Sequence, residues 1–154
     1  MMDAAQVKAL VDRSSYPGLM PEEVPVLRAW LAAHAAEWDS MEFNVRVGPG
    51  VDPGPTYSVE ERAWAVTNSQ RRLDALAKRP GLWAVVEAKV RAGASVMGQL
   101  LVYRSLVLSL QDSPQVVSLV CVCQQVPEEI RVAMYSYGIE VVRVVPLQSV
   151  LTGS

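Results

Sequence analysis

Hydrophobic and polar positions follow the spacing of strands or helices along most of this chain. Short runs that alternate with a period of two, or that are apolar throughout, predict β-strands, and apolar residues three and four apart predict helices. The expected strands cover residues 41–47, 64–77, 82–89, 116–122 and 139–145, and the expected helices cover residues 21–35, 94–110 and 127–137.

These elements follow one another as helix, three strands, helix, strand, helix and strand. The chain has 154 residues, of which 51% are apolar, so it is long enough to bury a substantial core. We therefore expect an α/β fold, in which a single domain of residues 1–154 holds a mixed central β-sheet flanked by helices.

The segment from residue 58 to residue 79 admits two interpretations. Ser58-Val59-Glu60-Glu61 has the form of a capping box, which would make the whole segment one helix. We favour a short helical or irregular start followed by a strand from about Trp64 through Ala77. In that interpretation the cluster at residues 68–70, Asn-Ser-Gln, marks a bulge or a break in the strand.

A tight turn at residues 78–81, Lys-Arg-Pro-Gly, separates two of the expected strands. Proline fixes φ and glycine tolerates positive φ, and strands joined by so short a loop must pair antiparallel. A turn centred on this segment places Glu87 almost opposite Asp74. Lys89, two residues further along its strand, shares a face with Glu87. If the segment were one continuous helix, this pairing could not form.

Two carboxylates and one amine on such a small patch have a chemical interpretation. Carboxylates held this close repel one another, and the pKa of one rises unless a cation lies beside them. A hard divalent cation such as Mg²⁺ takes oxygen ligands and keeps several of its waters, so two carboxylates and a substrate phosphate suffice to bind it. The simpler alternative is a solvated hairpin face on which Lys89 is only a surface ion-pair partner. Because Glu87 follows a run of Trp, Ala and Val that is expected to be half-buried, we favour the site.

The residues around the turn resemble the PD-(D/E)XK nuclease superfamily, also called restriction-endonuclease-like. Asp74 followed by Glu87-Ala88-Lys89 matches its D…(D/E)-x-K pattern. The segment 95–104, with Gln and Tyr four residues apart, resembles the Q-x-x-x-Y helix of its RecB-like and Cas4-like branch. The resemblance spans residues 62–123, and it departs from the pattern in having leucine, not proline, before the aspartate.

The resemblance implies a restriction-endonuclease-like core and a set of site residues. Asp74, Glu87 and the Ala88 carbonyl would bind Mg²⁺ or Mn²⁺. Lys89 would position or polarise the attacking water.

The remaining implied residues lie on neighbouring elements. Gln99 either orients a water or a phosphate, or only hydrogen-bonds the sheet, while Tyr103 is first of all a core aromatic that the family motif raises to a site candidate. Members of the family often add an acid from the first helix or the strand after it. The candidates here are Glu37 and Glu42, and we favour Glu37 because Glu42 lies on the polar face of its strand.

Charge is distributed unevenly along the chain. The net charge is −2, yet residues 62–104 carry +6 and the remainder carries −8. A basic rim around an acidic metal site suits a phosphodiester substrate, although charged strand edges also keep hairpins soluble. The expected nucleic-acid contacts are Arg71, Arg72, Arg91 and Arg104.

The two cysteines, Cys121 and Cys123, lie on a Val-rich run and are expected to be buried structural thiols. At this spacing they share a face and cannot easily form a disulfide. The longest apolar stretch is too short to span a bilayer, and no secretory signal precedes the first helix. We therefore expect a cytoplasmic protein without membrane contact.

The sequence thus predicts a Mg²⁺- or Mn²⁺-dependent nuclease that hydrolyses DNA phosphodiester bonds. With no additional recognition domain in view, structure-directed or end-directed cleavage fits better than sequence-specific cleavage, as in phage-type nucleases of this fold. A homodimer or a recruiting protein partner fits this activity. One alternative is a catalytically silent module of the same fold that binds nucleic acid or protein within a larger assembly. Another is an α/β interaction domain that contacts a partner through its acidic remainder.

Overall fold

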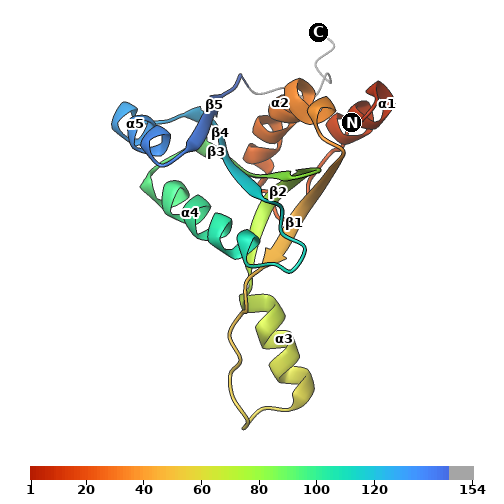
Figure 1. The fold of residues 1–154 in the computed structure, drawn as a ribbon, viewed down its shortest axis with the longest axis vertical. Helices are drawn as coiled ribbons and strands as arrows, with labels where there is room; N and C mark the ends of the chain where they lie inside the picture. The colour runs from red at the N-terminus through yellow and green to blue at the C-terminus, as the bar shows by residue number, and fades with distance from the viewer. Residues whose placement is uncertain (146–154) are drawn as a thin grey trace.

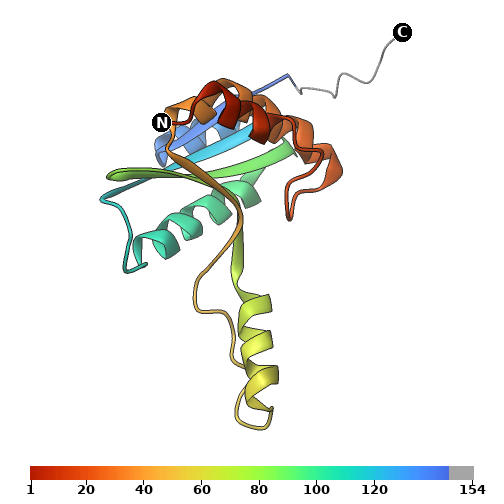
Figure 2. The same ribbon diagram turned by 90° about the vertical axis from the view of Figure 1, so that its right-hand side faces the viewer.

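One five-stranded mixed sheet with helices on both faces forms the body of the molecule (Figures 1 and 2). The computed structural model describes residues 1–145. The strands, in their order across the sheet, are β1 (Ser40–Val47), β2 (Arg71–Arg79), β3 (Leu82–Arg91), β4 (Val116–Gln125) and β5 (Ile139–Arg143). The helices are α1 (Ala4–Val11), α2 (Val24–His34), α3 (Val59–Ser69), α4 (Ala94–Leu108) and α5 (Glu128–Ser136), with 3₁₀ turns η1 (Pro21–Glu23) and η2 (Ala35–Glu37) on either side of α2.

The connections explain why the sheet is mixed. β1, β2 and β3 pair antiparallel, and β4 and β5 continue the sheet parallel to β3. A parallel neighbour requires a crossover, which α4 supplies between β3 and β4 and α5 supplies between β4 and β5. The predicted α/β class with a mixed sheet flanked by helices is confirmed.

Each face of the sheet covers its own apolar core. The α2 core, beneath α1 and α2, is built mainly from alanine and valine on the sheet side. The α4 core lies beneath α4 and α5 and includes Cys121 and Cys123, which are fully buried and unbridged, as the sequence predicts. Figure 2 shows α1 and α2 over one face and α4 over the other.

Strands β1 and β2 change face at one shared position. Val45 and its partner Leu73 pack in the α4 core, whereas Phe43 and its partner Ala75 lie on the α2 side. Strict alternation would put residues two apart on the same face. Asn44, between the two β1 residues, has φ of +51°, a left-handed conformation that asparagine tolerates better than most residues. The aspartate opposite it, at position 74, therefore occupies a kink in the sheet.

The segment 58–79 is a helix and then a strand, so the favoured start of the strand at Trp64 is wrong. Ser58 and Glu61 form the reciprocal capping box, which nucleates α3. The helix ends at Ser69 because Gln70 adopts extended backbone, and the β1–β2 ladder begins at the Val47–Arg71 pair. The 68–70 cluster does mark the break, and the alternative of one helix through residue 79 is also wrong.

A short N-terminal helix and the turn of the β2–β3 hairpin also bear on the sequence predictions. The helix α1, capped by Asp3 and Gln6, was not expected, and none of its residues is buried. The predicted turn between β2 and β3 is confirmed, with Gly81 at φ of +76°. Within residues 1–145, no helix combines the length and the apolar character needed to cross a membrane.

Candidate active site

The candidate site lies where β2 and β3 separate. Their ladder runs from the turn to the Ala75–Val86 pair, and the same register sets Asp74 opposite Glu87 at the next position. Beyond this point β3 stays paired with β4, and β2 stays paired with β1. The two carboxylates therefore occupy a fork in the sheet, in the arrangement that the hairpin predicts.

Two reciprocal hydrogen bonds tie the acids across the fork. The backbone N–H of Asp74 donates to Glu87 Oε1 at 3.0 Å, and the backbone N–H of Ala88 donates to Asp74 Oδ2 at 2.9 Å. Each carboxylate thus accepts a hydrogen bond from a backbone N–H of the opposite strand at the point where the β2–β3 ladder ends. The sheet itself holds the carboxylates in place, because the hydrogen bonds that orient them come from its backbone N–H groups.

Burial gives this pair unusual protonation behaviour. Glu87 is 3% exposed and is the only buried charged or polar side chain among the described residues. Burial raises the pKa of Glu87, and the negative charge of Asp74 raises it further. Burial also raises the pKa of Asp74, against the lowering effect of the Ala88 N–H. At neutral pH the pair therefore holds a proton or requires a cation.

Lys89 and an acid that the sequence interpretation did not single out lie beside the pair. Lys89 Nζ is 3.7 Å from Glu23 Oε1, and the side chain of Glu23 is only 13% exposed. Burial raises the pKa of Glu23, Lys89 lowers it, and the charge of Asp74 raises it. Glu23 belongs to η1, so its contact with Lys89 and the effect of the Asp74 charge on its pKa both indicate that η1 lies next to the fork.

Neither predicted helper acid joins this site. Glu37 is paired with His34, and its backbone carbonyl accepts from Arg79 at the turn end of the hairpin. Glu42 is paired with Lys78, also near the turn. Both acids therefore lie at the end of the hairpin opposite the fork, because β1 runs antiparallel to β2 and begins beside the turn. The acid that does lie beside the fork is Glu23, from the start of the expected helix at residues 21–35.

Helix α4 contributes Tyr103 and Gln99, which share one of its faces. Tyr103 is buried, and burial together with the charges of Glu87 and Asp74 raises its pKa to about 12. Its hydroxyl is therefore a neutral hydrogen-bond donor near the two acids. Gln99 is half-buried, and its side chain makes no hydrogen bond to any of the described residues.

The four predicted arginines fall at different distances from the fork. Arg71 and Arg72 are exposed at the start of β2, and the charge of Arg71 lowers the pKa of Tyr103. Arg91 is exposed at the end of β3, where it lines a cavity of about 380 Å³ that also contains Arg143. Arg104 is half-buried on α4, with its guanidinium beside Gly138.

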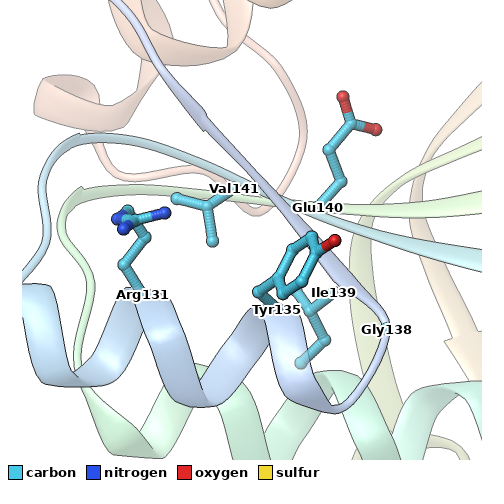
Figure 3. A pocket seen from close by; sticks show the side chains of 6 residues that line it. All are labelled: Arg131, Tyr135, Gly138, Ile139, Glu140 and Val141. Carbon is cyan, nitrogen blue, oxygen red and sulfur yellow. The ribbon is translucent and has the colours of Figure 1, made fainter.

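A separate hollow of about 380 Å³ lies between α5 and β5 (Figure 3). Arg131 and Tyr135 project from α5, whereas the carboxylate of Glu140 points to the other side of its strand. Arg131 is paired with Glu128. None of the predicted site residues lines this hollow, so it is not part of the candidate site.

The fork offers oxygen ligands that suit Mg²⁺ or Mn²⁺. Among the described residues no group of three or more His, Cys, Asp and Glu side chains is placed to hold a metal. A hard cation that keeps its waters needs only one or two carboxylates. The N–H and C=O of a strand residue point to the same side, so the Ala88 carbonyl faces the fork alongside its N–H. One buried and one half-buried carboxylate, with this carbonyl beside them, fit such an ion.

Replacing Glu87 with Gln tests the buried pair. In the unfolded chain Glu87 loses its proton above the ordinary carboxyl pKa, whereas in the folded protein it keeps the proton up to a higher pH. The free energy of unfolding of the wild type therefore falls as the pH rises from the ordinary carboxyl pKa toward the raised pKa of Glu87. Gln stays neutral and still accepts from the Asp74 N–H. In EDTA at about pH 8, we expect Glu87→Gln to raise the free energy of unfolding by about 2 kcal/mol, and at about pH 4 by little.

Denaturant unfolding across this pH range provides the measurement, and Glu42→Gln is the control. Glu42 is exposed and its ion pair is worth at most about 1 kcal/mol, so its variant should follow the wild type at every pH. Parallel pH curves for the wild type and Glu87→Gln would show that Glu87 is ionised in the folded protein.

Comparison of the chain with known protein families, curated proteins and solved structures gave no match, so the assignment of a function rests on the geometry of the fork.

Proposed function

We propose that this protein is a metal-dependent nuclease with a restriction-endonuclease-like core, which hydrolyses DNA phosphodiester bonds. The observation that carries the proposal is the pair of carboxylates at the fork, buried Glu87 and half-buried Asp74, with Lys89 two residues beyond Glu87. A protein core rarely keeps two unneutralised carboxylates in contact, and functional sites are where such strained protonation is found. The mixed sheet with helices on both faces also supports it, because the resemblance implies an α/β architecture of this class.

Asp74, Glu87 and the Ala88 carbonyl would hold the Mg²⁺ or Mn²⁺ ion. When bound, the ion lowers the pKa of its water and offsets the charge that develops on the phosphoryl oxygens. The chain prepares this site by fixing both carboxylates through backbone hydrogen bonds, so little reorganisation accompanies binding. Binding also displaces the proton that burial otherwise keeps on the pair.

Lys89 would orient the attacking water or contact the scissile phosphate. Its ammonium group is partly exposed and faces Glu23 at 3.7 Å, a distance longer than a direct hydrogen bond. Glu23 thus holds the lysine near the fork without engaging it fully. The neutral hydroxyl of Tyr103 and the unbonded amide of Gln99 lie on the α4 side, where each can donate to a water or a phosphate oxygen.

The exposed arginines would bind the phosphate backbone on either side of the cut. Arg71 and Arg72 flank the fork at the start of β2, and Arg91 flanks it at the end of β3. Contacts of this kind position the duplex without reading its sequence. For this reason we propose structure-directed or end-directed cleavage.

One observation favours a second candidate, a catalytically silent module of the same fold that binds nucleic acid or protein. Lys89 lies 3.7 Å from the Glu23 carboxylate in this structure, so part of its charge is already offset and less of it is available to a water or a phosphate. In such a module the carboxylate pair would only stabilise the fork, and divalent ions would change neither stability nor DNA binding. The experiments below separate the two candidates.

The first test is metal binding. Asp74→Asn keeps an oxygen that can accept from the Ala88 N–H but removes a charged ligand. We expect Mg²⁺ or Mn²⁺ to raise the melting temperature of the wild type, since an ion at ten times its Kd adds about 1.4 kcal/mol to stability. Asp74→Asn should lose this gain, and Glu42→Gln should keep it. An equal metal-induced shift in all three proteins would exclude the fork as the ion site.

The second test is cleavage. Labelled linear, nicked, branched and single-stranded DNA is incubated with the protein in Mg²⁺, Mn²⁺ or EDTA. We expect metal-dependent cleavage that falls at least about 100-fold in Lys89→Ala, because a positioned group of this kind contributes on that scale. Lys78→Ala is the matched control, since Lys78 lies on the same hairpin but is paired with Glu42 near the turn. DNA binding without cleavage in any metal would favour the silent module.

The third test concerns Glu23. We expect Glu23→Gln to lower cleavage about 10-fold, because the lysine loses the charge that holds it near the fork. Its neighbour Glu22 is exposed, and Glu22→Gln should cleave at the rate of the wild type. Equal rates for both variants would mean that Glu23 has no part in the site.

A further inference from the structure

Helix α3 and the loop before it form an arm that projects from the body of the molecule (Figures 1 and 2). The arm leaves the sheet after Val47 and returns at Arg71, which are paired with each other. None of the 11 residues of α3 is buried. An isolated helix of this length is marginal in water, so its own contacts must hold it in place.

The contacts within the arm cover only one side of α3. Arg62 makes two hydrogen bonds with the Asp52 carboxylate, at 2.9 and 2.6 Å, and the Ser69 hydroxyl accepts from the Val51 N–H at 2.6 Å. These bonds hold the loop against the helix. The side of the helix that carries Trp64 receives no such cover.

That uncovered face has the character of an interface. Trp64 is 72% exposed, and Ala63 directly before it and Thr67, three residues after it, are exposed as well. A tryptophan beside small side chains gives a large anchor and room for a second helix to approach closely. Tryptophan is among the residues that contribute most to binding energy at protein interfaces.

The two ends of the arm carry opposite charge. Glu60 and Glu61 lie at the start of α3, far from the sheet. At the base, Arg46 and Arg72 are exposed and directly opposite each other on β1 and β2, and neither has a carboxylate partner among the described residues. Like charges in this position destabilise a sheet unless an acid neutralises them. The tip of the arm therefore complements its own base.

We propose that α3 is a self-association arm, which pairs antiparallel with α3 of a second copy across a two-fold axis. Trp64 is the midpoint of Val59–Ser69, so an axis there brings each Trp64 against the other helix. The acidic start of one helix then lies beside the basic base of the other. Along the arm, Glu60 and the partner arginine are about 10 Å apart, which their two long side chains can span.

The same charges argue against nucleic acid as the occupant of this face. The tip is acidic, and the only arginine of α3 is already bonded to Asp52. A phosphate backbone would be repelled there, whereas the base of a second arm would be attracted. The proposal rests on the arm and on the two arginines at its base, and it does not depend on nuclease activity.

The size of the arm sets the expected strength of the dimer. A helix of 11 residues is about 16 Å long, so two such helices bury less area than a standard interface. We therefore expect a reversible dimer with a dissociation constant on the order of micromolar.

Sedimentation equilibrium of the full chain from about 1 to 200 μM tests the proposal, over the range in which micromolar dimers dissociate. We expect the wild type to dimerise and Trp64→Glu to raise the dissociation constant at least about 30-fold, as loss of an interface anchor does. Tyr135→Glu, at an 80% exposed aromatic on α5, is the matched control and should dimerise as the wild type does. Thr67→Glu gives a second variant on the same face, and circular dichroism establishes that each variant is folded.

A wild type that stays monomeric across this range overturns the proposal. So does a dimer that survives both α3 substitutions, or one that Tyr135→Glu dissociates as strongly. The antiparallel arrangement has its own test in charge reversal. Glu60→Arg should weaken the dimer, and adding Arg72→Glu should restore it, whereas failure of the double variant to recover would exclude this pairing of tip and base.

Discussion

The hydrogen bonds that cross the β2–β3 fork are the contacts on which the candidate site depends. They join a carboxylate of each strand to a backbone N–H of the other where the ladder ends, and one of these carboxylates, Glu87, is the only buried charged side chain among the described residues. Such an arrangement cannot be optimised for stability alone, because a buried acid beside a second carboxylate opposes folding unless a proton or a cation accompanies the pair. The kink at Asn44 and Asp74 adds to this local strain, and the site lies where the regular sheet is interrupted on both sides.

The rest of the fold holds that fork rigidly. β3 is central, paired with β2 on one side and β4 on the other, and β4 places fully buried Cys121 beside Glu87 and fully buried Cys123 beside Lys89. Apolar neighbours of this kind withhold solvent from the acids and keep their mutual repulsion strong. α4 closes the same face and brings Tyr103 within electrostatic reach of the pair. Burial, and not an unusual residue, gives these carboxylates their character.

The features of the fold and of the candidate site that depend on local sequence signals could be predicted from the sequence. The Pro-Gly turn and the period of two in its flanking strands set Asp74 opposite Glu87 before any tertiary contact is considered. The contact between Glu23 and Lys89 gave no such signal, because it joins two segments far apart in the chain and Glu23 also suits a helix start. The helix α3 was misjudged for the opposite reason. With no buried residue it has no apolar face directed to the core, and its only signal was the Ser58–Glu61 cap.

Because of where the arm is inserted in the chain, its length does not affect the register of the sheet. Val47 and Arg71 are neighbours across the β1–β2 ladder, so whatever connects them needs only to close a gap of one strand spacing. Lengthening, shortening or replacing the arm leaves the strand pairing, both cores and the fork where they are, at a cost in loop-closure entropy that grows only slowly with length. Self-association through the arm and the chemistry of the fork can thus change independently as the protein evolves.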